Sequence, residues 1–126
     1  MRAIEFRGQN INGHWAHGNL AIIKEKLDRA EIGTYISNSA GAPFAYQVRP
    51  ETIGQYTGLK DKNGKKIFEG DLCWDERNEC YGVVKFEEGK FLYAWENIAE
   101  DLWEVADSIE IYGNIHENLE LLEVME

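Results

Sequence analysis

Alternation between apolar and polar residues, with turn residues between the alternating segments, is the main pattern of this chain and is typical of β-strands. In the first half, residues 3–7 and 14–20 alternate on either side of an Asn-Gly turn. Residues 34–37 and 44–48 form two further short segments, separated by a loop of small and turn-forming residues. The pattern therefore predicts a β-rich N-terminal part.

The second half shows the strand pattern more clearly. Its predicted strands are residues 55–59, 65–69, 72–74, 81–86, 91–95 and 109–112. The first two flank Asn63 and Gly64, a pair that gives the strongest short hairpin signal because both residues tolerate positive φ. A second hairpin is expected where residues 81–86 and 91–95 flank a turn that contains Gly89.

Helical spacing occurs in two segments. The apolar positions of residues 20–32 that recur in this way are Leu20, Ile23, Leu27 and Ala30. Good helix formers lie between them, which favours a helix on local grounds. The corresponding positions in residues 98–107 are Ile98, Leu102, Val105 and Ala106, and they predict a short helix.

The order of these elements from about residue 54 to residue 114 is that of a small SH3-like barrel. We therefore expect a mainly β fold of the β-rich α+β class, with the barrel in the C-terminal half, extra N-terminal strands and one or two short helices. A length of 126 residues favours a single domain. Its N-terminal β-rich part would cover residues 1–48, and the barrel-like part with a C-terminal extension would cover residues 49–126.

Acidic side chains outnumber basic ones, with 23 Asp and Glu against 13 Lys and Arg and a formal net charge of −10. Direct nucleic-acid binding needs cations that displace counterions from phosphates, so this balance argues against it. Acidity keeps a protein soluble and steers it toward basic partners, and it can also imitate nucleic acid. The basic cluster at the predicted hairpin tip consists of Lys60, Lys62, Lys65 and Lys66, read either as a solvated turn or as a phosphate-binding patch.

Aromatic residues supply the other candidate binding positions, which are Tyr56, Trp74, Tyr93 and Trp95. A small β-barrel can line a groove with such side chains and accept an extended Pro-rich peptide. The same residues also suit a hydrophobic core. The sequence leaves both roles open for each of them.

No catalytic constellation is visible, and we expect neither an enzyme nor a metal or cofactor site. The three histidines are scattered, and the strand pattern around His14 and His17 places them on opposite faces. Cys73 and Cys80 lack the two-residue gap of a zinc knuckle. Free thiols in a reducing compartment are expected for them, with a bridge across a hairpin as the alternative. Neither a secretory signal nor a bilayer-spanning run is apparent, which predicts a cytoplasmic protein without a membrane partner.

Three segments carry a resemblance to a known family. They are residues 50–72, PETIGQYTGLKDKNGKKIFEGDL, residues 1–8, MRAIEFRG, and residues 109–122, IEIYGNIHENLELL. They resemble the central, opening and closing signatures of the YopX family, small proteins carried mostly by phages and prophages. Leu119 stands where that family commonly has proline, so the final turn could continue as helix.

The resemblance implies a phage-encoded protein in the cytoplasm of a bacterial host, and it brings no catalytic residues and no established activity. For residues 20–32 the family pattern suggests a strand, a turn and another strand instead of a helix. We expect a module that binds a host or phage protein. The alternative is a nucleic-acid-associated module, through the hairpin lysines or acidic imitation, and a small enzyme is the third reading. Apolar edge strands also predict a homo-oligomer.

Overall fold

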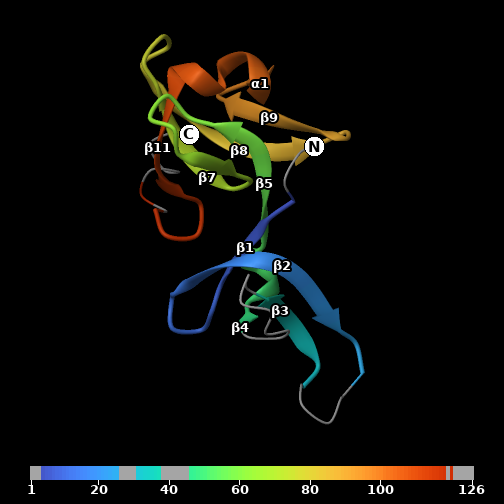
Figure 1. The fold of residues 1–126 in the computed structure, drawn as a ribbon. Helices are drawn as coiled ribbons and strands as arrows, with labels where there is room; N and C mark the ends of the chain where they lie inside the picture. The colour runs from blue at the N-terminus through green and yellow to red at the C-terminus, as the bar shows by residue number, and fades with distance from the viewer. Residues whose placement is uncertain (1–3, 26–30, 38–45, 119, 121–126) are drawn as a thin grey trace. The chain divides into compact units, whose positions relative to one another are not determined.

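The computed structural model describes residues 4–25, 31–37, 46–118 and 120 of the chain. The chain folds into two compact units, Met1–Tyr56 and Thr57–Glu126 (Figure 1). Both are built mainly from antiparallel β-strands, which confirms the predicted mainly β class.

The first unit is a sheet of short strands arranged around one long strand. Its elements are β1 (Phe6–Gln9), β2 (Trp15–Ile23), β3 (Gly33–Ser37), β4 (Tyr46–Val48), the 3₁₀-turn η1 (Pro50–Thr52) and the start of β5 (Gly54–Lys60). The strands are ordered β4-β3-β2-β1-β5. The first half of β2 pairs with β1, and its second half pairs with β3. One continuous strand therefore joins two hairpins.

The helix expected over residues 20–32 is wrong where the structure describes this segment, because residues 20–23 are part of β2. Residues 26–30 lie outside the described residues. Helix propensity is a weak preference that tertiary pairing readily overrides. Here Ala21 pairs with Tyr35 and Ile23 with Gly33, so β3 satisfies the backbone groups of this segment. The strand suggested by the family resemblance is the correct alternative.

A small apolar core stabilises the first unit. Ile23 and Tyr35 are buried together with Ala21 packed against them, and Ile36 and Val48 are also buried. Gly8 allows β1 to approach this core closely, since a Cβ atom there would lie 2.8 Å from the Val48 side chain.

The second unit contains a five-stranded antiparallel sheet with the order β10-β9-β8-β7-β11. Its elements are the end of β5, β6 (Lys66–Phe68), β7 (Asp71–Asp75), β8 (Cys80–Glu87), β9 (Lys90–Trp95), β10 (Ile98–Asp101), α1 (Leu102–Val105), the 3₁₀-turn η2 (Ala106–Ser108) and β11 (Ile109–Asn114). Figure 1 shows β7, β8 and β9 side by side, with α1 near β9.

Two predictions for this unit need correction. The helix expected over residues 98–107 begins only at Leu102, because residues 98–101 pair with β9 as β10. The SH3-like barrel is not confirmed, since the five-stranded sheet ends at β10 and β11 and the described strands do not close it. The prediction for Leu119 falls on a residue outside the described part of the chain.

One face of the five-stranded sheet is covered by α1, η2 and the β5–β6 hairpin. The buried residues of this core are Ile67, Cys73, Val84, Tyr93, Leu102, Val105, Ala106 and Ile109. Gly82 lies beneath the Tyr93 ring, and a Cβ atom there would come within 2.3 Å of that ring. Among the described residues, the second unit therefore has a larger buried apolar cluster than the first.

Candidate binding surfaces

The four aromatic residues expected at a binding groove occupy different environments. Tyr93 is fully buried, its hydroxyl donates to the Cys73 carbonyl oxygen at 3.0 Å, and burial raises the pKa of that hydroxyl. Tyr56 is also buried. Trp95 packs partly against the core, and its Nε1 donates to Glu100 Oε2 at 3.0 Å. Trp74 is partly exposed. Trp74 and Trp95 are therefore the two of the four that are only partly buried.

Trp74 belongs to a row of three rings that we call the aromatic ladder: Trp74, Tyr81 and Tyr112. The Trp74 and Tyr81 rings meet edge to face with centroids 5.0 Å apart. The Tyr81 and Tyr112 rings meet in the same way at 5.8 Å. Since β7 lies between β8 and β11 in the sheet, this second contact spans β7. The ladder is therefore assembled from three strands.

Tyr112 is the most accessible ring of the ladder, with 55% of its surface exposed. It lies where the pairing register of β11 with β7 shifts between Ile111 and Gly113. Such an irregularity redirects a side chain relative to the regular pleat. Sequence reasoning missed both Tyr81 and Tyr112, because only the pairing of Trp74 with Tyr81 and this shift bring the rings together.

The four hairpin lysines do not form a uniform basic patch. Lys62 Nζ lies 3.1 Å from Glu76 Oε1 and 3.9 Å from Glu110 Oε2. The hydrogen bond to Glu76 raises the pKa of the Lys62 ammonium, and the charge of Glu110 adds to the effect. The other members of the cluster are exposed: Lys60, Lys65 and Lys66. Carboxylates of the second unit thus pair directly with Lys62.

The turn that carries Lys62 is organised by Asp61, a residue that the sequence analysis passed over. Asp61 is buried, and its Oδ1 accepts hydrogen bonds from the N–H groups of Asn63 and Lys65, both at 2.9 Å. The Gly64 N–H donates to the Asp61 carbonyl oxygen at 3.0 Å, and φ of Gly64 is +80°. The predicted hairpin is confirmed. Of the two residues only Gly64 adopts positive φ, because the loop is a three-residue turn that ends in glycine.

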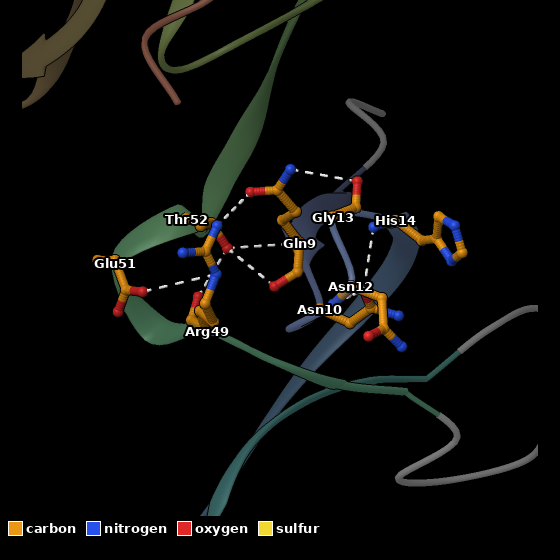
Figure 2. Close-up of polar contacts among 8 residues, drawn as sticks. All are labelled: Gln9, Asn10, Asn12, Gly13, His14, Arg49, Glu51 and Thr52. Carbon is orange, nitrogen blue, oxygen red and sulfur yellow. Dashed lines mark hydrogen bonds and ion pairs between the residues drawn. The ribbon is translucent and has the colours of Figure 1, made fainter. Parts of the chain in front are cut away.

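The first unit contains a turn of the same construction between β1 and β2 (Figure 2). Asn10 Oδ1 accepts from the N–H groups of Asn12 and His14, both at 2.9 Å. The Gly13 N–H donates to the Asn10 carbonyl oxygen at 3.1 Å, and φ of Gly13 is +86°. Figure 2 shows the His14 ring directed away from this network.

A polar network from η1 supports the base of this turn (Figure 2). The Arg49 guanidinium donates to Gln9 Oε1, and Gln9 Nε2 donates to the Gly13 carbonyl oxygen at 3.2 Å. The buried Thr52 hydroxyl accepts from the Gln9 N–H at 2.8 Å and donates to the Arg49 carbonyl oxygen at 2.7 Å. Hydrogen bonds therefore tie the turn to a segment about 40 residues away in the sequence.

A buried carboxylate, that of Asp75, lies at the end of β7. It accepts hydrogen bonds from Arg77 Nη2 at 3.1 Å and from Asn78 Nδ2 at 2.8 Å. Burial by itself would raise the pKa of this carboxyl, but the hydrogen bonds from Arg77 and Asn78 outweigh burial and lower it. Burial and the nearby carboxylates raise the pKa of the Cys80 thiol. A thiol with a raised pKa is a poor nucleophile at neutral pH.

Both cysteines are free thiols. Within the described residues, no group of three His, Cys, Asp or Glu side chains could hold a metal ion. None of the helices in the described part of the chain is long and apolar enough to cross a membrane.

Comparisons with known proteins identify a family and a related fold. The family described as YopX protein matches residues 5–123. The crystal structure of protein EF1440 from Enterococcus faecalis is similar, with a TM-score of 0.63 and 23% identity, and the match covers 97% of this chain and 99% of that one. At this identity the likeness establishes the fold alone. None of the curated proteins matches the chain.

Proposed function

The chain belongs to the YopX family, and we propose that it acts by binding a basic protein of a phage or of its bacterial host in the cytoplasm. The aromatic ladder of the second unit is the proposed contact surface. The observation that carries this proposal is the continuous edge-to-face row of Trp74, Tyr81 and Tyr112, which ends in a ring that is 55% exposed.

Aromatic rings of this kind suit protein recognition. Tyr and Trp supply large contact areas, and they are enriched among the residues that contribute most to binding energy. The ladder rings hold one another in place, so little side-chain freedom would be lost when a partner covers them. Their polar atoms can reach solvent or partner groups at the rim.

The charge of the second unit defines the chemistry of the partner. Residues 57–126 contain 18 Asp and Glu against seven Lys and Arg. Around Lys62, the carboxylates of Glu76 and Glu110 lie 3.1 Å and 3.9 Å from its Nζ, and their two negative charges exceed its single positive charge. A basic protein surface would therefore be attracted during encounter, and its Lys or Arg side chains could stack on the exposed ring of Tyr112.

The proposal is tested by capture and then by titration. The intact chain would be used as bait in a bacterial lysate, and each captured basic protein would be purified and titrated by calorimetry against the wild type and Tyr112→Ala. We expect the variant to lose about tenfold or more in affinity, as at a binding hot spot. Trp103→Ala is the matched control, because Trp103 is 71% exposed on α1 and lies outside the ladder. Equal affinity of Tyr112→Ala and the wild type would overturn the proposal.

Self-association through an edge strand is a further part of the proposal. The described sheets leave β4 and β10 at their edges, and both strands carry exposed apolar side chains, Tyr46 and Ile98. Exposed edges are templates for pairing with a second copy. A dimer should tighten as salt screens the mutual repulsion of acidic subunits. Light scattering that reports a monomer at both low and high salt would contradict it.

A further inference from the structure

The two turns described above share one five-residue pattern, in which Asn or Asp is followed by any residue, Asn, Gly and any residue. The two copies are Asn10–His14 and Asp61–Lys65. Each has the same pair of side-chain bonds to its own backbone and the same glycine with positive φ. Each is closed by one more bond, from the first N–H to the last carbonyl oxygen, at 2.9 Å in the first unit and 2.8 Å in the second.

In the second unit the outward side of this turn is occupied by a β-strand. The Lys62 N–H donates to the Ile109 carbonyl oxygen at 3.0 Å. The Ile111 N–H donates to Asp61 Oδ2, also at 3.0 Å. The side chain of Lys62 faces two carboxylates, as described above. The turn therefore binds the free edge of β11 through one backbone donor and one side-chain atom.

In the first unit the same outward groups have no such strand among the described residues. The position equivalent to Lys62 is Ile11, whose side chain is 88% exposed. Within the described part of the chain no group accepts a hydrogen bond from the Ile11 N–H or from the Asn10 side-chain amide. Gln9 Nε2 donates to the Gly13 carbonyl oxygen of the turn, and Arg49 and Thr52 bond to Gln9.

We propose that the turn at residues 10–14 is a docking site for an extended segment of a partner protein, in the way that its counterpart docks β11. The chemistry differs at two positions. Asn10 presents an amide donor where Asp61 presents an acceptor, so the segment must offer carbonyl oxygens to both outward groups. Ile11 replaces Lys62, so the segment carries apolar side chains where β11 carries Glu110. This site lies within the first unit and does not depend on the aromatic ladder.

A peptide derived from the chain's own β11 serves as the probe, because its Ile109 carbonyl oxygen can accept from the Ile11 N–H as it accepts from the Lys62 N–H in the second unit. Its Ile111 N–H cannot pair with the Asn10 amide, so this probe tests the backbone donor of the turn alone. It copies residues 107–113 with the substitution Glu110→Leu and is titrated into the isotope-labelled full chain while amide signals are followed by NMR. We expect a saturable downfield shift of the Ile11 amide proton at millimolar peptide, because that N–H gains an acceptor. The unaltered peptide should bind several-fold more weakly, since its carboxylate would meet an apolar side chain.

Two variants separate the backbone donor from the side chain. Ile11→Pro removes both, and proline suits the first central position of such a turn, so the fold is retained and binding is lost. Ile11→Ala keeps the N–H and should weaken binding about tenfold or less. Peptide binding to Ile11→Pro and Ile11→Ala is followed through the Asn12 amide signal, because proline has no amide proton at residue 11. Ile32→Ala, at a residue that is 60% exposed, is the control and should bind like the wild type, as should Tyr112→Ala.

The outcomes are decisive in either direction. Saturable shifts around Ile11 that disappear in Ile11→Pro support the proposal. An unmoved Ile11 amide, or equal binding by Ile11→Pro, overturns it. If the Ile11 amide moves with protein concentration alone, the occupant is a second copy and the proposal of a different partner fails. The proposal also fails if duplex DNA shifts the Ile11 amide signal and the peptide does not.

Discussion

The two units of this chain reach an ordered structure by different means. The first unit has a small apolar cluster, and hydrogen bonds among Gln9, Arg49 and Thr52 connect its distant segments. The second unit has a core of eight buried residues beneath its sheet. Their charges differ as well. Residues 1–56 contain six Lys and Arg against five Asp and Glu, whereas residues 57–126 contain seven against 18.

This difference shows how one turn motif can serve two purposes. In the second unit the turn is part of the fold, because Asp61 and Lys62 bind the backbone of β11. In the first unit the turn is supported from below, and its outward side remains available in the described structure. In the second unit the turn is bound to a strand of the sheet. In the first unit hydrogen bonds support the turn and leave its outward groups available for the proposed partner.

The largest effect is expected in the core of the second unit. Leu102 is fully buried, and Leu102→Ala should lower the free energy of unfolding by about 3 kcal/mol through lost burial and a new cavity. Urea unfolding followed by far-UV circular dichroism measures it, and hydrogen exchange should locate the loss in residues 57–126. The neighbouring exposed residue is the control, and Trp103→Ala should change stability by about 0.5 kcal/mol or less. Equal losses of unfolding free energy in Leu102→Ala and Trp103→Ala would contradict the placement of Leu102 in the core.

The buried carboxylate of Asp75 should give the next largest effect. Asp75→Ala removes the acceptor for Arg77 and Asn78 and should cost about 2 kcal/mol at neutral pH. Asp107→Ala, at an exposed position of η2, should cost about 0.5 kcal/mol or less.

The pH dependence of the same group follows from its lowered pKa. A carboxyl with a lowered pKa in the folded state contributes stability above its ordinary value of 3.8, and this contribution is lost as the pH falls through the lowered value. Urea unfolding from about pH 5 to about pH 2 should therefore show a steeper loss for the wild type than for Asp75→Ala. If the free energies of unfolding of the wild type and Asp75→Ala changed in parallel with pH, the Asp75 carboxylate would not have the lowered pKa that its hydrogen bonds imply.

Mutation of the polar network in the first unit should lower the free energy of unfolding by less than Leu102→Ala does in the core of the second unit. Thr52→Val keeps the shape of the side chain but leaves the buried Gln9 N–H without its acceptor, which should cost about 1–2 kcal/mol. Faster hydrogen exchange should be confined to residues 9–14 and 49–52. Glu51→Gln is the matched control, because its ion pair with Arg49 is exposed and contributes little. Unchanged exchange in Thr52→Val would show that the network does not support the turn.

A smaller effect should distinguish the two turns directly. Gly64→Val and Gly13→Val each place a β-branched residue at positive φ, at a cost of about 1 kcal/mol or more. A Cβ atom at Gly64 would meet nothing within 4 Å, so its cost is conformational. Gly64→Val should still cost more in thermal unfolding, because moving that turn also disturbs the bonds from Lys62 and to Asp61. Equal losses of stability in Gly64→Val and Gly13→Val would contradict the description of the turn at residues 61–65 as docked and that at residues 10–14 as free.

The smallest expected effect concerns duplex DNA. A net charge of −10 repels a polyanion, and four lysines limit the salt slope to about −4. Lys62 is moreover engaged by Glu76. We expect no gel shift at micromolar protein in about 0.15 M salt, for the wild type and for the variant with all four lysines replaced. A salt-sensitive shift that disappears in that variant would favour the nucleic-acid reading.

Local patterns predicted most of the strands because alternation reports which face of a strand is buried. Residues 81–86 and 91–95 became β8 and β9 almost as expected. The prediction failed where local preference and pairing disagree, at residues 20–23 and 98–101, since both segments have a neighbouring strand as partner. The candidate sites were harder to predict. Of the four aromatic candidates only Trp74 joins the ladder, and Tyr81 and Tyr112 become its neighbours through register alone.

The sequence by itself determined the family, the acidic balance, the mainly β class and both Asn-Gly turns, because these depend on composition and on residues close together in the chain. Only the tertiary structure decided what the turns do. Residues about 50 positions apart bring the Ile111 N–H to Asp61, and no local pattern contains that contact. It likewise decided that Tyr93 is core while Tyr112 is exposed, since burial depends on which strands and helices cover a face of the sheet.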